Sequence, residues 1–309
     1  MSFTYRNFSG KRDFALMVDL ASRFAADHLR VIDLPYRFSS WAFDQPENAA
    51  LWFGDDGGLA GWAVLQTPFW TVDITCDPAS EVSLYPQILA WVDRRVQETA
   101  GTEFARPAWF MNIFSGQSAR IHMLEAAGFI CQAEVGEDSW SKVLMRRDGQ
   151  APVKAYQPPA GFTIRPLAGI EEVPAYVDLH QSVFESRNMT VPWRERTLCQ
   201  ESYRPDLDLV ITAPDGRLAA FCICWLSRSP TGALLGQVEP LGCHKAFRQF
   251  ALGRVVLSAG LQRIKEAGVE AVYVETDNYR NAAFRLYRFF DFKVIQDVLV
   301  FRKDYPALA

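Results

Sequence analysis

The alternation of apolar and polar residues is clearest in the second half of the chain. Short apolar runs predict strands at 162–164, 208–212, 217–226, 233–243 and 270–276, with further strands over 292–301. Helical spacing of apolar residues predicts helices over 173–184, 252–267 and 282–289. This order of elements predicts an α/β (α+β) fold, in which a mixed, mostly antiparallel central sheet is flanked by helices on both faces.

Two landmarks occur once in each half of the chain at nearly constant spacing. Asp56-Gly57 and Asp215-Gly216 each precede an apolar strand, 159 positions apart, and Phe129 and Phe292 each follow a helix, 163 positions apart. A segment rich in proline and glycine lies between the halves. We therefore expect two tandem domains, residues 1–150 and 161–309, joined by a linker over 151–160.

Composition and charge narrow the class of protein. A chain of 309 residues that is 49% hydrophobic can bury a large core. Its net charge of -4 disfavours nucleic acid and anionic membrane surfaces as partners. The sequence shows neither a secretory signal nor a membrane-spanning run, so a cytoplasmic monomer or homodimer is expected. Its six cysteines and four histidines lack metal-ligand spacing, so no metal site is expected.

The segment 238–254 joins a predicted strand to the predicted helix 252–267. It places Arg248, Ala251 and Gly253 in a pattern that resembles the signature Gln/Arg-x-x-Gly-x-Gly/Ala of the GCN5-related N-acetyltransferase (GNAT) superfamily. The first N–H groups of a helix lack carbonyl partners and carry partial positive charge, which suits a diphosphate. Arg248 and Arg254 can add charge-assisted hydrogen bonds. Ala251 stands where the family usually has glycine, so we expect weaker cofactor binding.

A second block, residues 275–292, resembles the family's Asn, Ala, Leu-Tyr, Gly-Phe pattern, with Asp291 in place of the glycine. The resemblance implies that the C-terminal half binds acetyl-coenzyme A. It also implies an N-acetyltransferase reaction, in which a primary amine of a small molecule attacks the thioester directly. The residues that the resemblance assigns to the cofactor are Leu241, Gly242, Cys243, Arg248, Gln249, Phe250, Ala251, Leu252, Gly253, Arg254, Asn278, Asn281 and Ala283.

Three side chains are candidates for proton transfer. The resemblance puts Tyr287 near the thioester sulfur, where it could protonate the leaving thiolate, although a helical tyrosine is also a common packing residue. Glu239 is the first candidate for the general base, and it could equally bind a cationic acceptor without exchanging protons. His244 is the second candidate base, and capping of the following turn is its alternative role.

The first half lacks the phosphate-binding pattern. Residues 77–85 contain Asp77 and Glu81 and neither glycine nor arginine, so residues 1–150 are expected to be a degenerate GNAT-like domain. The tandem arrangement is similar to that of mycothiol synthase, in which one half is catalytic. An acyl-coenzyme A sensor and a structural pseudoenzyme without turnover remain alternatives.

Acceptor contacts in this family come from variable loops, here expected over 185–204. Three arginines of that segment, Arg187, Arg194 and Arg196, indicate either an acceptor that carries a carboxylate or a charged surface.

Overall fold

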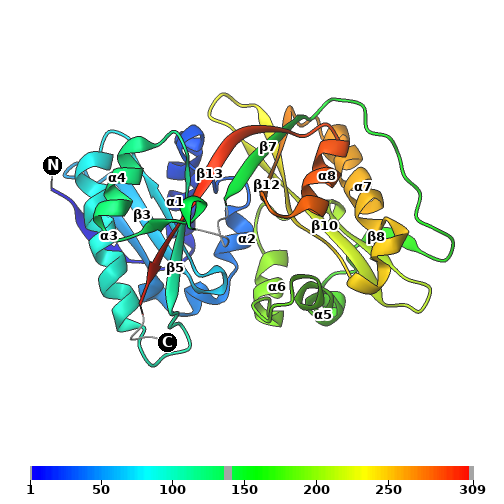
Figure 1. Ribbon diagram of the computed structural model, residues 1–309, viewed down its shortest axis with the longest axis horizontal. Helices are drawn as coiled ribbons and strands as arrows, with labels where there is room; N and C mark the ends of the chain where they lie inside the picture. The colour runs from blue at the N-terminus through cyan, green and yellow to red at the C-terminus, as the bar shows by residue number, and fades with distance from the viewer. Residues whose placement is uncertain (1, 136–140, 306–309) are drawn as a thin grey trace. The chain divides into compact units, whose positions relative to one another are not determined.

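The computed structural model describes residues 2–135 and 141–305, and it divides the chain into two units (Figure 1). The described residues of unit 1 lie within Met1–Val143, Asp277–Tyr279 and Gln296–Ala309, and those of unit 2 within Leu144–Thr276 and Arg280–Ile295. The predicted second domain, 161–309, is thus divided between the units, because most of the last strand belongs to unit 1.

Unit 1 is built on a sheet with strand order β1-β2-β3-β4-β5-β13, and β6 also pairs with β13. Its pairings are antiparallel except for the parallel pair β4–β5. The strands are β1 (Thr4–Asn7), β2 (Ala49–Phe53), β3 (Leu59–Gln66), β4 (Thr71–Cys76), β5 (Ala108–Phe114), β6 (Ile130–Cys131) and β13 (Lys293–Asp304). The helices are α1 (Lys11–Arg23), α2 (Leu34–Phe38), α3 (Glu81–Glu98) and α4 (Ser118–Ala126).

Helices cover both faces of the unit 1 sheet. Successive residues of a strand point to opposite faces. Accordingly, Trp62 packs with Met17 and Leu20 of α1, whereas its neighbour Ala63 belongs to the core that contains Ile88 of α3. All five residues are buried, so two apolar cores hold this unit together.

Unit 2 repeats the plan with strand order β12-β11-β10-β9-β8, and β7 lies next to β12. Its pairings are antiparallel from β8 to β11 and parallel between β11 and β12. The strands are β7 (Lys142–Asp148), β8 (Thr163–Pro166), β9 (Asp208–Thr212), β10 (Leu218–Arg228), β11 (Leu234–Cys243) and β12 (Ala271–Asp277). The helices are α5 (Val173–Phe184), α6 (Val191–Leu198), α7 (Leu252–Glu266) and α8 (Asn281–Phe289).

The two faces of the unit 2 sheet are also covered, with α5 and α6 on one side and α7 and α8 on the other (Figure 1). Phe221 of β10 stacks on His180 of α5 with 5.6 Å between ring centroids. The next residue, Cys222, faces the other way, because a Cβ on Gly260 of α7 would lie 3.3 Å from its sulfur. The predicted mixed, mostly antiparallel sheet with helices on both faces is confirmed in each unit.

Three segments differ from the sequence-based predictions. The expected strands over 292–301 are one strand, β13, because no turn residue interrupts 293–304. The expected variable loop 185–204 contains the helix α6, whose first turn is capped by the Thr190 hydroxyl accepting from the Trp193 N–H at 3.3 Å. The linker 151–160 packs on unit 2, since Ser258 Oγ donates to the Lys154 carbonyl at 2.7 Å.

Both halves form the predicted hairpin turn with the same hydrogen bonds. Gly54 N donates to Gly58 O at 3.0 Å, and Ala213 N donates to Arg217 O at 2.8 Å. The equivalent positions are again 159 residues apart, so the repeat inferred from the sequence is present at the level of backbone hydrogen bonds.

Among residues 2–135 and 141–305, no helix has both the length and the apolar composition needed to cross a bilayer.

Candidate active site

In unit 2 the parallel strands β11 and β12 pair only over a short stretch and then part. Their register runs from Leu235 to Gln237 opposite Ala271 to Tyr273. Just beyond it, β11 has a bulge, because Cys224 pairs with Val238 whereas Cys222 pairs with Leu241. The register with β12 thus ends where the bulge begins, and the residues of β11 beyond the bulge are not part of that register.

The turn that follows β11 leads directly into helix α7. His244 Nδ1 accepts a hydrogen bond from Ala246 N at 3.2 Å, which confirms the capping role predicted for this histidine. Ala251 precedes α7 in the left-handed conformation, with φ 55° and ψ 28°. Ala251 has no side-chain oxygen that could cap α7, and in the first turn the Gly253 N–H is hydrogen-bonded to the Cys243 sulfur.

A cavity of about 750 Å³ lies beside this helix start, entirely within unit 2. Cavities of this size hold ligands of cofactor size. Its lining comes from the end of α5, the end of β11, the start of α7 and the length of α8. The lining residues are Val183, Phe184, Leu241, Gly242, Cys243, Arg248, Ala251, Gly253, Arg254, Arg280, Asn281, Ala282, Ala283, Arg285, Leu286 and Phe289.

All charged side chains in this lining are positive. The lining includes Arg248, Arg254, Arg280 and Arg285 and contains no aspartate or glutamate. Four arginines in the lining, together with the N-terminus of α7, give the cavity a positive potential in a protein whose net charge is -4. The cavity therefore suits an anion with several charges, such as a diphosphate.

Nine of the residues that the sequence assigned to the cofactor line this cavity. They are Leu241, Gly242, Cys243, Arg248, Ala251, Gly253, Arg254, Asn281 and Ala283. Three others lie in the same turn with their side chains directed elsewhere. Gln249 Nε2 donates to the Ala246 carbonyl at 2.9 Å, Phe250 packs on Phe162 with 5.0 Å between centroids, and Leu252 is fully buried.

Asn278 is not among the lining residues, and it belongs to unit 1. Its side-chain nitrogen donates to Ser141 Oγ at 2.9 Å, and its backbone N–H donates to the Ser141 carbonyl at 3.0 Å. The structure therefore gives Asn278 hydrogen bonds that fix the end of β12.

The two candidate catalytic side chains, Tyr287 and Glu239, are close enough to interact electrostatically. Tyr287 is 6% exposed, and burial, followed by the negative charge of Glu239, raises its pKa. The phenol thus stays protonated at neutral pH, as a general acid requires. Glu239 is partly buried, and its carbonyl accepts from Trp225 Nε1 at 2.7 Å. Neither side chain is among those that line the cavity.

Cys243 lines the cavity and has the properties of an inert thiol. Burial raises its pKa to about 11, although the positive charge of Arg248 and a hydrogen bond from the Gly253 backbone act in the opposite direction. A thiol with this pKa is protonated at neutral pH, so Cys243 is not a nucleophile here.

Several lining residues were not predicted from the sequence. Arg285, Leu286 and Phe289 lie one and two turns beyond Asn281 and Ala282 on α8, so helical spacing from the family-like block could have found them. Val183 and Phe184 come from the end of α5, far away in the sequence, and no local motif marks them.

The position of Arg194 contradicts the interpretation that the arginines of segment 185–204 form a charged surface. Arg194 is fully buried, forms an ion pair with Asp208 and lies 3.9 Å from the Tyr176 ring centroid. Tyr203 also donates to Asp208, at 2.7 Å. This arginine therefore fixes α6 to β9 inside unit 2.

Backbone hydrogen bonds identify the corresponding positions of unit 1. Phe129 N donates to Leu124 O at 3.0 Å, as Phe292 N does to Tyr287 O at 3.1 Å. Leu124 therefore replaces the candidate acid, and by the same offset of 163 residues Arg120 stands where unit 2 has Ala283. The β3–β4 register also runs from Gly61–Cys76 to Gln66–Thr71 without the bulge found in unit 2.

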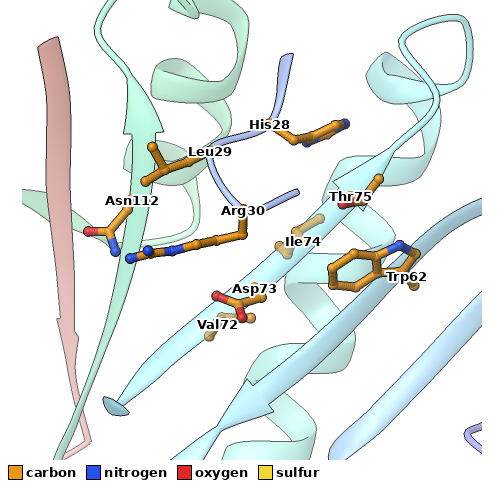
Figure 2. A pocket seen from close by; sticks show the side chains of 9 residues that line it. All are labelled: His28, Leu29, Arg30, Trp62, Val72, Asp73, Ile74, Thr75 and Asn112. Atoms are coloured by element: carbon orange, nitrogen blue, oxygen red, sulfur yellow. The ribbon is translucent and has the colours of Figure 1, made fainter. Parts of the chain in front are cut away.

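The chain itself occupies the space between the parting strands of unit 1. Figure 2 shows Arg30 extending between the strand that carries Asp73 and the strand that carries Asn112. His28 Nε2 lies 3.3 Å from the Cys76 carbonyl, and Arg120 Nη1 donates to the Asp27 carbonyl at 2.7 Å. Two cavities that remain here measure only about 30 Å³ each, the size of a water site.

The start of α3 is filled in the same way. Glu81, in the first turn of this helix, forms a salt bridge of 2.8 Å with Arg120. Its carboxylate lies at the helix end where an anion would bind, and Arg120 neutralises it. In unit 1 the Glu81 carboxylate thus lies at the start of α3, and the segment 27–30 lies between the strands. The corresponding positions of unit 2 border the cavity.

Comparison with known proteins finds that part of the chain is similar to acetyltransferases. Residues 173–292 match the model of the acetyltransferase (GNAT) family. A mycothiol acetyltransferase from Nocardiopsis dassonvillei is 33% identical over 94 residues, which cover 28% of this chain and 28% of that protein. One from Thermomonospora curvata is 28% identical over 147 residues, which cover 46% of this chain and 48% of that protein. The matches span less than half of either relative.

The fold has counterparts among solved structures along its whole length. A tandem GNAT protein from the clavulanic acid biosynthesis pathway superposes with a TM-score of 0.64 at 13% sequence identity, covering 98% of both chains. At this identity the match establishes the fold alone.

Proposed function

We propose that the chain is an acetyl-coenzyme A-dependent N-acetyltransferase whose reaction takes place in unit 2, since residues 173–292 match the acetyltransferase (GNAT) family and parts of the chain are similar to mycothiol acetyltransferases. The observation that carries the proposal is the cavity of about 750 Å³ at the start of α7, lined by four arginines and no acidic residue. The N–H groups at the start of α7, with Arg248, would hold the diphosphate of the coenzyme.

The end of β11 would hold the pantetheine arm. Leu241, Gly242 and Cys243 line the cavity after β11 has parted from β12, so backbone groups on that side are no longer used by the β11–β12 register. Gly242 has a role that no larger residue can take, because a Cβ there would lie 2.5 Å from Phe221 Cζ and 2.6 Å from Val183 Cγ1. A side chain at this position would push the strand out of place and alter the cavity.

Tyr287 and Glu239 would carry out the two proton transfers. The lone pair of a primary amine on a small-molecule acceptor attacks the thioester carbonyl, so the new C–N bond forms as the C–S bond breaks. Glu239 accepts the proton that the amine loses, and Tyr287 donates its phenolic proton to the departing thiolate. The phenol of Tyr287 is protonated at neutral pH, so it carries the proton that this step requires. His244 already accepts from Ala246 N through Nδ1, which leaves it the lesser candidate for the base.

The proposal is tested by release of free thiol from acetyl-coenzyme A in the presence of a panel of small primary amines. We expect thiol release that depends on at least one amine, and its loss in Tyr287→Phe. Binding of acetyl-coenzyme A without turnover across the panel would replace the enzyme by a sensor. Absence of binding would leave a structural pseudoenzyme.

A further inference from the structure

The unit 2 cavity has a buried inner end and an exposed outer end. Gly242, on β11, is buried, whereas Arg254, Arg285 and Phe289 are exposed. Phe289 keeps 48% of its surface accessible, although it is a large apolar side chain. Arg254 lies against it, with Cζ 4.3 Å from the ring centroid. The outer end thus presents an exposed ring and a cation held side by side.

The segment between β7 and β8 lies outside the cavity lining itself and adds a second ring and a second cation beside Phe289 and Arg254. The Tyr156 ring centroid lies 6.0 Å from that of Phe289 and 5.6 Å from Arg254 Cζ. The ammonium group of Lys154 lies 5.4 Å from the Tyr156 centroid. Since Ser258 Oγ on α7 donates to the Lys154 carbonyl at 2.7 Å, the segment is fixed on the helix that forms the cavity.

The order of chemical groups along coenzyme A matches the change from the buried inner end of the cavity to its exposed, aromatic and positively charged outer end. Its thiol end is uncharged and flexible, its middle is a diphosphate, and its far end is an adenine ring on a ribose that carries a 3′-phosphate. With the diphosphate at the start of α7, the far end extends to the exposed side of the cavity. Adenine suits an aromatic wall, and a phosphate dianion suits two neighbouring cations.

We propose that Lys154 and Tyr156, together with Arg254 and Phe289, form the site for the adenosine 3′-phosphate end of coenzyme A. The inference rests on the proposed function and deepens it. Lys154 and Arg254 bind the 3′-phosphate, and Tyr156 and Phe289 contact the adenine. The segment between the two repeats is therefore part of the coenzyme site as well as a covalent connection.

Three ligands of decreasing length test the assignment by isothermal titration: coenzyme A, 3′-dephospho-coenzyme A and 4′-phosphopantetheine. Lys154→Ala should weaken binding of coenzyme A about five- to tenfold and leave the other two ligands unchanged, because only the first carries the 3′-phosphate. Tyr156→Ala should weaken the first two ligands by a similar factor of about five- to tenfold and leave 4′-phosphopantetheine unchanged.

Lys293→Ala is the matched control, because this exposed lysine of unit 2 belongs to β13 and, unlike Lys154, makes no cation–π contact with the Tyr156 or Phe289 ring. It should leave all three affinities unchanged. Equal losses for all three ligands in Lys154→Ala and Tyr156→Ala, or no loss in either, would overturn the assignment and leave the proposed function standing. Failure of the wild-type protein to bind coenzyme A would overturn both.

Discussion

Replacing Ala251 by glycine should stabilise this protein, although alanine is ordinarily the better helix residue. Ala251 precedes α7 at φ 55° and ψ 28°, in the left-handed region. A residue with a Cβ adopts this region at a cost of about 1–2 kcal/mol. Glycine removes that cost. It also increases the conformational entropy of the unfolded chain, which destabilises the folded protein by about 0.4–1 kcal/mol. Because Ala251 is exposed, its methyl contributes little burial, and the net gain is about 0.5–1 kcal/mol.

The assay is urea-induced unfolding of Ala251→Gly beside a control with the same chemical change. Ala259→Gly lies inside α7 in ordinary helical conformation, and there glycine should destabilise by about 1 kcal/mol. The two variants therefore differ in the sign of the effect. Since Ala251 also lines the cavity, Ala251→Gly should bind acetyl-coenzyme A more tightly. Destabilisation of Ala251→Gly by as much as Ala259→Gly would refute the argument from backbone strain.

Further predictions address a second strained residue, catalysis and pH. Asp291 has φ 62° where unit 1 has Gly128, so Asp291→Gly should raise the free energy of unfolding by up to about 1 kcal/mol in the same urea titration. Tyr287→Phe should lower kcat by about 100-fold or more with little change in KM for acetyl-coenzyme A; steady-state kinetics showing a raised KM at unchanged kcat would instead make Tyr287 a packing residue. Burial, followed by the charge of Arg120, lowers the pKa of His28 to about 3. Below about pH 6.5 the unfolded chain therefore gains a proton that the folded protein does not, and the free energy of unfolding falls by about 1.4 kcal/mol per pH unit. His28→Gln should lose this component, so its stability between about pH 6 and pH 4 should fall less steeply than that of the wild type.

Elements with a strong local period were predictable from the sequence. The apolar positions of α7 recur at helical spacing, and β9 is a short apolar run between turn residues, so both follow from patterning alone. Helix α6 was missed because three of its eight residues are Thr or Arg that break the apolar period, and its Arg194 is buried as an ion pair. The Thr190 cap was the available signal.

Long-range pairing was not predictable. The end of β13 pairs with β5 of unit 1, from Val298 opposite Phe114 to Asp304 opposite Ala108. Register between segments so far apart in sequence depends on side-chain packing, which no local motif records. The acidic residues after Cys76 were a local signal, and they predicted that unit 1 has lost its phosphate site. The segment 27–30, which fills the space between the strands, is distant in sequence and carries no motif, so its position could not be predicted.

The central claim, that acetyl-coenzyme A binds in the unit 2 cavity and not in unit 1, is tested most directly by calorimetric titration with one substitution. Ala283→Glu places a carboxylate in the cavity lining, at the position where Arg120 fills unit 1. Ala160→Glu adds the same charge at an exposed site outside that lining. We predict one bound acetyl-coenzyme A per chain in the wild type and in Ala160→Glu, and none in Ala283→Glu. Two bound molecules per chain, or undiminished binding to Ala283→Glu, would contradict the account.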